Sequence, residues 1–374
     1  MSRITYLTNI DFGAGELAHL PDVLVGLGIA RPLIVSDNGI RAAGLLDRLT
    51  ALLPAGTPTF LEVPTNPSEA AILAALEAYR AAACDGVVAF GGGSPIDLAK
   101  AVALLATHDG KLADFAAIYG GLGRITPAVA PVVAIPTTAG TGSEVGRAAL
   151  VTLADGHKVG LISPHLIPRH AICDPALTQG LPPRLTAATG FDAMSHCIET
   201  YLSPRDNPPA EAIALDGFGR IWRALDRAVA DGADIAARTE MMMGSLEGGL
   251  TFQKGLGAVH ALSHALGGTP GLALHHGMLN AIFLPPVLRF NAAAVPQKIG
   301  RLKEVAGLAA GADLAEAIEG RVAALGLPTR LSQLGVSASH EGQTASWALA
   351  DHSHATNPVQ PSEDEYRALF RAVL

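Results

Sequence analysis

Short runs rich in β-branched residues alternate with helical stretches over the first half of the chain. Four such runs, each bounded by turn residues, are predicted to be buried strands: 32–36, 59–63, 86–90 and 131–135. Apolar residues at helical spacing between them predict helices over 68–83, with Ser68 as the N-cap, and over 95–107. This alternation predicts a parallel, Rossmann-like sheet with helices on both faces.

The pattern changes near residue 180, where β-type runs become rare and helical periodicity takes over. Helices are predicted over 183–201, 209–230, 235–252, 256–266, 278–291, 296–309, 314–325 and 363–373. The proline pair in Gly180-Leu181-Pro182-Pro183 is typical of a domain boundary. We therefore expect an α/β domain over residues 1–180, followed by an all-helical domain over residues 181–374.

The composition is that of a compact globular enzyme. The chain has 374 residues, of which 49% are hydrophobic and 16% charged. A net charge of −8 without a Lys/Arg cluster argues against a nucleic-acid partner. No apolar run is long enough to cross a bilayer, and the first ten residues lack the apolar core of a signal peptide. We expect a cytoplasmic protein without a membrane partner.

The three cysteines are scattered and form no Cys-x-x-Cys pair, which indicates a reducing compartment. Cys197 lies beside a histidine, but a small buried apolar residue is the favoured interpretation. The β-type segment 4–10 could pair with the edge strand of another subunit and so form a dimer.

Three glycines follow the third predicted strand, in the segment Gly91-Gly92-Gly93-Ser94-Pro95-Ile96-Asp97. Glycine lets the backbone approach a ligand closely, and a helix N-terminus offers free N–H groups to a phosphate. Ser94 as N-cap, Pro95 at the first helical position and Asp97 predict a helix start resembling a capping box. The segment lacks the Gly-x-Gly-x-x-Gly spacing, so a tight turn that binds nothing is the alternative.

A second loop, 136–144, follows the fourth predicted strand and reads Pro-Thr-Thr-Ala-Gly-Thr-Gly-Ser-Glu. Two such loops at the carboxyl edge of one sheet indicate a site for a pyrophosphate. Asp37 follows the first predicted strand and could accept hydrogen bonds from a ribose diol. Its charge would repel a 2′-phosphate, which favours NAD over NADP. The alternative for Asp37 is a turn or N-cap residue.

Metal-ligand side chains gather in three segments of the helical half. The pairs Asp192/His196 and His260/His264 are four residues apart, a spacing that places both members on one helix face, and His275-His276 follows. One carboxylate and three imidazoles suit Fe²⁺, Zn²⁺ or another transition metal better than Ca²⁺ or Mg²⁺.

The candidate side chains outnumber the four ligand positions, so not all of them can be ligands. His264, one turn beyond His260, could relay a proton. His275 and His276 should point in different directions, and His276, beside Gly277, is preferred as the ligand, with His275 left open. The polar surroundings of three further histidines predict surface positions for His340, His352 and His354.

Together these motifs resemble the iron-containing (group III) alcohol dehydrogenase family over nearly the whole chain. The matching segments are Phe12-Gly13-Ala14-Gly15, 91–94, 136–144, Cys173-Asp174-Pro175, 192–196 and 260–277. The resemblance implies a dehydroquinate-synthase-like two-domain fold with the active site in the cleft between the domains. It also implies a homodimer or higher oligomer, and an NAD-dependent, metal-dependent reaction that interconverts a small alcohol and its aldehyde or ketone.

The resemblance further implies a role for individual residues. It makes Asp192, His196, His260 and His276 the metal ligands and places His264 near the nicotinamide as the catalytic histidine. The expected cofactor-binding residues are Asp37, Asn66, Gly92, Gly93, Ser94, Asp97, Thr137, Thr138 and Lys158. In this mechanism the metal, Fe²⁺ or Zn²⁺, polarises the substrate oxygen while a base relays the proton.

Three other interpretations keep part of this picture. Gly267-Gly268 is similar to the metal-independent maleylacetate reductases, which reduce a carbon–carbon double bond in a dicarboxylic acid, but that branch carries Asn at the position of Asp192. An acidic substrate needs a cation, for which the candidates are Arg147, Arg169, Arg184 and Lys254. Another metal- and NAD-dependent enzyme of the same fold is a further enzymatic alternative. A nucleotide sensor without turnover is the non-enzymatic alternative. The sequence does not identify the substrate.

Overall fold

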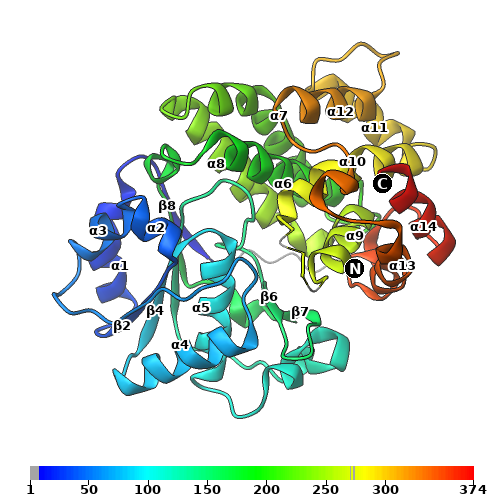
Figure 1. Cartoon of the computed structure of the whole chain (residues 1–374). Coiled ribbons are helices and arrows are strands. Elements are labelled where there is room, and N and C mark those ends of the chain that lie inside the picture. The colour runs from blue at the N-terminus through cyan, green and yellow to red at the C-terminus, as the bar shows by residue number, and fades with distance from the viewer. Residues whose placement is uncertain (1–7, 270, 273) are drawn as a thin grey trace. The chain divides into compact units, whose positions relative to one another are not determined.

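The computed structural model describes residues 8–269, 271–272 and 274–374 (Figure 1). The chain divides into two compact units, one ending at Gly180 and the other beginning at Leu181. Residues 4–7 of the expected pairing segment 4–10 lie outside the described part. Within that part, no helix is both long enough and apolar enough to cross a membrane.

A six-stranded sheet forms the centre of the first unit, and every pairing in it is parallel, as predicted. Its order is β1 (Asn9–Phe12), β8 (His170–Cys173), β5 (Val132–Pro136), β4 (Gly86–Gly91), β2 (Pro32–Val35) and β3 (Thr59–Phe60). In the central pair, Gly91 of β4 lies opposite Pro136 of β5. The glycine loop and the threonine loop therefore leave the sheet from adjacent positions.

Side chains of the buried strands alternate between two cores. Leu33 and Val35 face one core and Ile34 faces the other. The first core includes residues of α4 (Glu69–Ala81) and α5 (Gly93–Leu105), and the second includes residues of α1 (Leu20–Gly26) and α3 (Leu45–Thr50). Figure 1 shows these helix pairs on opposite faces of the sheet. The sheet is thus covered on both sides, which explains why its strands lack a polar face.

Helix starts in this unit match the prediction at one place and differ at another. Ser68 is the N-cap of α4 and accepts a hydrogen bond from the Ala71 N–H at 3.3 Å, as predicted. The prediction of Ser94 as N-cap of α5 was wrong, because the helix begins at Gly93 with Gly92 as the N-cap. The hydroxyl of Ser94 donates instead to the carbonyl of Thr65.

The sequence pattern missed several short elements of the first unit. These are α2 (Asn38–Ala42), α1 and α3, the strand β8, and an antiparallel hairpin of β6 (Ala148–Thr152) and β7 (Lys158–Ile162). Strand β1 overlaps the predicted β-type segment 4–10 at residues 9 and 10, which pair with β8 of the same chain. The predicted strand 59–63 is reduced to the two residues of β3.

The second unit is helical throughout its described residues, as predicted. Its helices are α6 (Pro183–Leu202), α7 (Pro208–Ala230), α8 (Ile235–Leu250), α9 (Ala258–Gly267), α10 (His276–Asn291), α11 (Pro296–Val305), α12 (Leu314–Ala324), α13 (Glu341–Ala350) and α14 (Glu363–Ala372). Helix α6 is buried from Thr186 to Leu202, so polar side chains on it lie inside the unit. Helix α13 was not predicted.

Candidate metal centre and cofactor loops

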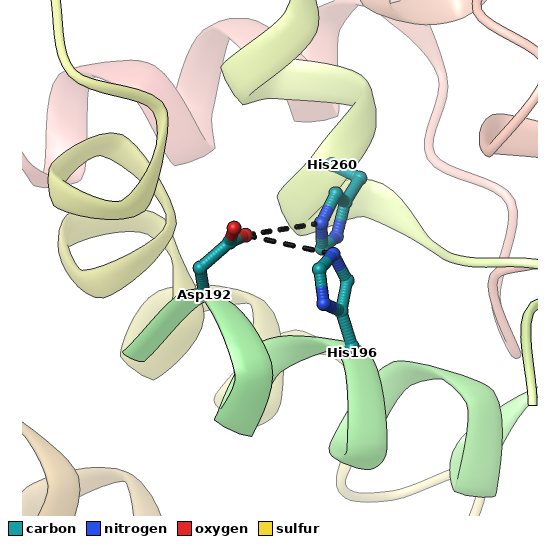
Figure 2. A group of neighbouring side chains, drawn as sticks. All are labelled: Asp192, His196 and His260. Carbon is teal, nitrogen blue, oxygen red and sulfur yellow. Dashed lines mark ion pairs between the residues drawn. The ribbon is translucent and has the colours of Figure 1, made fainter. Parts of the chain in front are cut away.

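Helix α6 supplies the first two members of a buried cluster. Asp192 and His196 are one turn apart, and the Asp192 Oδ1 lies 3.5 Å from the His196 Nε2. Asp192 is only 3% exposed and His196 only 4%. Figure 2 shows both side chains pointing toward His260, which comes from α9. The four-residue spacing therefore brings these two side chains together on one helix face, as predicted.

Helix α9 places the His260 Nε2 3.7 Å from the same Asp192 oxygen. The N-cap of α9, Gly257, has no side chain to satisfy the first N–H groups of the helix. Two distant residues do so instead: Glu199 accepts from the Val259 N–H at 2.7 Å, and Asn357 accepts from the Ala258 N–H at 3.0 Å. The start of α9 is thereby fixed to α6.

Glu199 also accepts a hydrogen bond from the His260 Nδ1. A neutral imidazole that donates from Nδ1 keeps its lone pair on Nε2, the atom that lies near Asp192. Burial alone would lower the pKa of His260, but the Glu199 and Asp192 carboxylates outweigh burial and raise it to about 9, so a metal that binds Nε2 must displace a proton from it. A carboxylate behind a histidine ring is a common arrangement around a metal-binding imidazole.

His276 is the first residue of α10, and its Nε2 lies 3.6 Å from the Asp192 Oδ1. A Cβ on Gly277 would lie 2.2 Å from the backbone oxygen of Ala188, so only glycine lets α10 approach α6 this closely. His275 is the N-cap of α10, and burial lowers its pKa. Among the described residues, no hydrogen-bond partner lies near the buried His275 Nδ1.

The donor set fits a divalent transition metal. Three imidazole nitrogens lie 3.5–3.7 Å from one carboxylate oxygen. Tetrahedral ligands with bonds of about 2.1 Å are about 3.4 Å apart, which is close to this spacing. Asp192, His196 and His260 also offer ligand atoms within 4.8 Å of one another. Burial would raise the pKa of Asp192, yet the His196 and His276 imidazoles hold it well below its usual range.

An amide donor lies among these ligand atoms. The Asn280 Nδ2 is 2.7 Å from the Asp192 Oδ1 and 3.2 Å from the Nε2 atoms of both His260 and His276. Lone pairs from three different helices therefore converge on one electropositive group. The same convergence of lone pairs is what a bound cation requires.

His264 lies one turn beyond His260 and carries contacts that the sequence did not reveal. Its Nδ1 donates to the Asp351 carboxylate at 3.1 Å. Its ring stacks on His276, with 5.2 Å between centroids, and on His352, with 5.7 Å. His352 was predicted to lie at the surface, and its side chain is indeed 38% exposed. Its contact with His264 was not predicted. Asp351 was not among the predicted site residues.

In the first unit the two predicted cofactor loops lie against each other. The Thr137 N–H donates to the Gly91 carbonyl at 3.0 Å. A Cβ on Gly93 would lie 2.7 Å from the Thr141 Cγ2, and one on Gly92 would lie 3.4 Å from the Thr138 Oγ1. The glycines thus permit the close packing of the loops and leave the N-terminus of α5 without a side-chain cap.

Both carboxylate oxygens of Asp97 are held by hydrogen bonds from the protein itself. It accepts hydrogen bonds from the Ser143 hydroxyl at 2.5 Å and from the Leu150 N–H at 3.0 Å. The buried Lys100 ammonium donates to Ser143 at 2.9 Å and to the Gly146 carbonyl at 3.0 Å. These contacts tie the threonine loop to α5. The prediction that Asp97 completes a capping box at the start of α5 is wrong, because its carboxylate accepts from Ser143 and Leu150 instead. No sequence pattern pointed to Lys100.

The structure places Asp37 as the N-cap of α2, where its Oδ1 accepts from the Ile40 N–H at 2.9 Å. This is the alternative role named for Asp37. Its second oxygen, Oδ2, lies beside the glycine loop, 3.5 Å from the position of a Cβ on Gly91. Two further predicted cofactor residues meet directly, since the Lys158 Nζ donates to the Asn66 Oδ1 at 3.2 Å.

Family models and relatives agree with this combination of loops and ligands. Residues 8–175 match the model for "Iron-containing alcohol dehydrogenase", and residues 186–374 match the model for the C-terminal part of the same family. The chain is 49% identical to a 4-hydroxybutyrate dehydrogenase from Cupriavidus necator, with 99% of each chain covered.

Solved structures share the whole fold. The crystal structure of a 1,3-propanediol oxidoreductase superposes with a TM-score of 0.93 at 34% identity and covers 100% of both chains. A sulfoacetaldehyde reductase from Bifidobacterium kashiwanohense, solved in complex with NAD⁺, has a TM-score of 0.88 at 27% identity and covers 100% of this chain and 98% of its own. The chain therefore belongs to the iron-containing alcohol dehydrogenase family and is an oxidoreductase of that family.

Proposed function

We propose that the chain oxidises a primary alcohol to its aldehyde with NAD⁺, and catalyses the reverse reaction, using one divalent metal held by Asp192, His196, His260 and His276. The observation that carries this proposal is the placement of three imidazole Nε2 atoms 3.5–3.7 Å from one oxygen of Asp192. These ligand types accept Fe²⁺ and Zn²⁺ alike, and we propose one of these two. Asp192 also argues against the maleylacetate-reductase alternative.

A bound metal at this site would supply Lewis-acid polarisation of the substrate oxygen. The protein side chains would do the rest. Glu199 keeps the His260 lone pair on Nε2 by accepting the Nδ1 hydrogen. His264 takes the alcohol proton during oxidation and returns a proton during reduction, which is assistance typically worth about 10² to 10⁴ in rate. Burial of Asp192 and His260 keeps water away from these two ligands.

For the cofactor, we propose that Gly92, Gly93 and Ser94 offer the first N–H groups of α5 to the pyrophosphate. Thr137 and Thr138 would line the same groove from the adjacent loop. The Asp37 oxygen that does not cap α2 would accept a hydrogen bond from the adenosine ribose, which selects NAD over NADP. Asn66 and Lys158 would approach the cofactor together.

We further propose that residues 1–180 form the dinucleotide-binding domain and residues 181–374 the metal-binding domain. The division of the chain between Gly180 and Leu181 supports this assignment. A cytoplasmic homodimer or higher homo-oligomer is proposed from the resemblance of the motifs to the family.

The substrate we propose is a short ω-hydroxy acid such as 4-hydroxybutyrate, because the 49% identical relative bears that name. Such a substrate needs a cation for its carboxylate. Of the two candidates in the second unit, Lys254 is buried against Glu211, whereas Arg184 is exposed, and its Nη2 lies 3.9 Å from the Met278 Sδ near the start of α10. Arg184 is therefore the preferred carboxylate partner.

The direct test is a substrate panel. Metal-loaded protein is mixed with NAD⁺ and with 4-hydroxybutyrate, 1-butanol, ethanol or 1,3-propanediol, and NADH is followed by its absorbance. The proposal expects turnover of primary alcohols and the highest kcat/KM for 4-hydroxybutyrate. Absence of turnover with every alcohol, and with the matching aldehydes and NADH, would contradict it.

A further inference from the structure

A buried acid lies directly behind the histidine to which the proposed function gives the proton. Asp351 follows the last residue of α13, and its Oδ2 accepts from the His264 Nδ1 at 3.1 Å. The two residues are 87 positions apart in the chain. The contact therefore arises only from the packing of α13 against α9.

The other oxygen of Asp351 is also held. Its Oδ1 accepts from the backbone N–H of Ser353 at 2.7 Å. The Asp351 side chain is 15% exposed, and although burial would raise its pKa, the His264 and His352 imidazoles hold the pKa well below its usual range. An ionised carboxylate has no hydrogen to donate, so Asp351 can only accept from both partners.

This geometry fixes which nitrogen of His264 carries hydrogen. A ring that donates from Nδ1 to a carboxylate keeps its lone pair on Nε2, at the opposite side of the ring. The stacking of His264 on His276, with an interplanar angle of 10°, further restricts the ring orientation. Only a lone pair on Nε2 lets the ring accept a proton there.

We propose that Asp351 is a positioning residue: it orients His264 and holds it in the tautomer with hydrogen on Nδ1, so that Nε2 accepts the substrate proton. This inference rests on the proposed function, because it needs His264 to act as the base. Asp351 touches neither substrate nor metal in this scheme and acts through His264 alone. An aspartate that orients a catalytic histidine has a similar role in hydrolase triads.

The substitution Asp351→Asn gives a sharp test. The Ser353 N–H requires an acceptor, so the amide oxygen of the new side chain stays on Ser353 and the NH₂ group turns to the His264 Nδ1. The amide then donates to Nδ1, and His264 carries its hydrogen on Nε2, where it cannot accept a proton. The size of the side chain is unchanged, so the fold and the metal site are preserved.

Asp313→Asn is a matched control. Asp313 accepts from the Ala315 N–H at 2.8 Å, in the same two-residue relationship, but contacts no histidine of the cluster. The experiment measures metal content, kcat and KM for metal-loaded wild type, D351N, D313N, H264A and the H264A/D351N double variant. The nitrogen chemical shifts of ¹⁵N-labelled histidine report the His264 tautomer independently of turnover.

We expect D351N to keep its metal and its KM within about threefold and to lose about 10²-fold or more in kcat, the range of general-base assistance. D313N should match wild type. In the H264A background, D351N should change kcat by less than about twofold, since residues that act as one unit are not additive. The ¹⁵N shifts should report hydrogen on Nε2 in D351N.

Three results would overturn the proposal. One is wild-type kcat in D351N. Another is a loss of activity in proportion to lost metal or lost folded protein, which would give Asp351 a structural role. The third is a metal content of two per chain that falls to one in D351N, because His264, Asp351 and His352 also offer ligand atoms within 4.8 Å of one another. If wild type itself turns over no alcohol, the proposed function fails, while the tautomer measurement still tests the role of Asp351.

Discussion

Glu199 of α6 accepts hydrogen bonds from both the His260 ring and the Val259 N–H, so one carboxylate fixes a metal-ligand ring and the start of its helix. In Glu199→Gln, the amide oxygen of the new side chain still accepts a hydrogen bond from the Val259 N–H. Its NH₂ group therefore faces the His260 Nδ1. The ring is then driven to carry hydrogen on Nε2, where the metal needs a lone pair. We expect metal affinity to fall by about 10- to 100-fold, measured by competition with a chelator. The exposed Glu316→Gln on α12 is the control, and equal affinities for all three proteins would refute the role of Glu199.

Adjacent histidines at the start of α10 should differ in their effect on the metal. The His276 Nε2 lies 3.6 Å from Asp192, whereas His275 precedes the helix, and its buried Nδ1 has no hydrogen-bond partner within the described chain. We expect His276→Ala to lose most of its metal and its turnover together, and His275→Ala to retain its metal. Metal analysis of the two purified variants decides between them. The opposite result would make His275 the fourth ligand.

Asp37 offers a test of cofactor choice. Asp37→Asn keeps an N-cap on α2 but removes the charge that would repel a 2′-phosphate. Asp37→Gly also removes the capping side chain, which costs only about a few tenths of a kcal/mol in stability. We expect both variants to raise the ratio of kcat/KM for NADP⁺ to that for NAD⁺ by about tenfold or more. A wild type that already prefers NADP⁺ would contradict the assignment of Asp37.

The buried Glu144 should make stability depend on pH. Burial raises the pKa of Glu144 to about 7, from an ordinary value near 4.5. Between pH values of about 4.5 and 7 the folded protein binds more protons than the unfolded chain, so the free energy of unfolding falls as pH rises through this window. The loss is about 3 kcal/mol at about 1.4 kcal/mol per pKa unit.

Glu144→Gln carries no charge in this range, so its Tm relative to wild type should increase between pH 5.5 and pH 8. The buried Lys100, whose pKa burial lowers to about 8, acts mainly above this window. Glu77→Gln, on the exposed side of α4, serves as the control. A Tm difference that is the same at both pH values would show that Glu144 does not titrate in this window.

Local spacing predicted much of the candidate metal site. Asp192 and His196 are one helical turn apart, and the glycine beside His276 permits the close approach of α10 to α6. The parallel sheet and its two loops were predictable because buried strands leave continuous apolar runs. The helix start at α5 was not, since three consecutive glycines allow several starting points and Ser94 found a distant acceptor.

The residues that orient the histidines could not be predicted from the sequence. Glu199 and His260 are 61 positions apart, and His264 and Asp351 are 87 apart, so neither contact has a local spacing. Helix α13 was missed because its apolar positions are mostly alanine, which gives a weak periodic signal. Without that helix, the acid at its end could not be placed near His264.

Removal and return of the metal tests whether alcohol oxidation requires one ion on Asp192, His196, His260 and His276. The protein is stripped with a chelator, its metal content is measured, and NADH formation from 4-hydroxybutyrate and 1-butanol is followed before and after addition of Fe²⁺ or Zn²⁺. We predict activity that is lost with the metal and restored as about one ion per chain is bound, the number that a single four-ligand site holds. Full turnover by demonstrably metal-free protein would contradict a metal-dependent reaction.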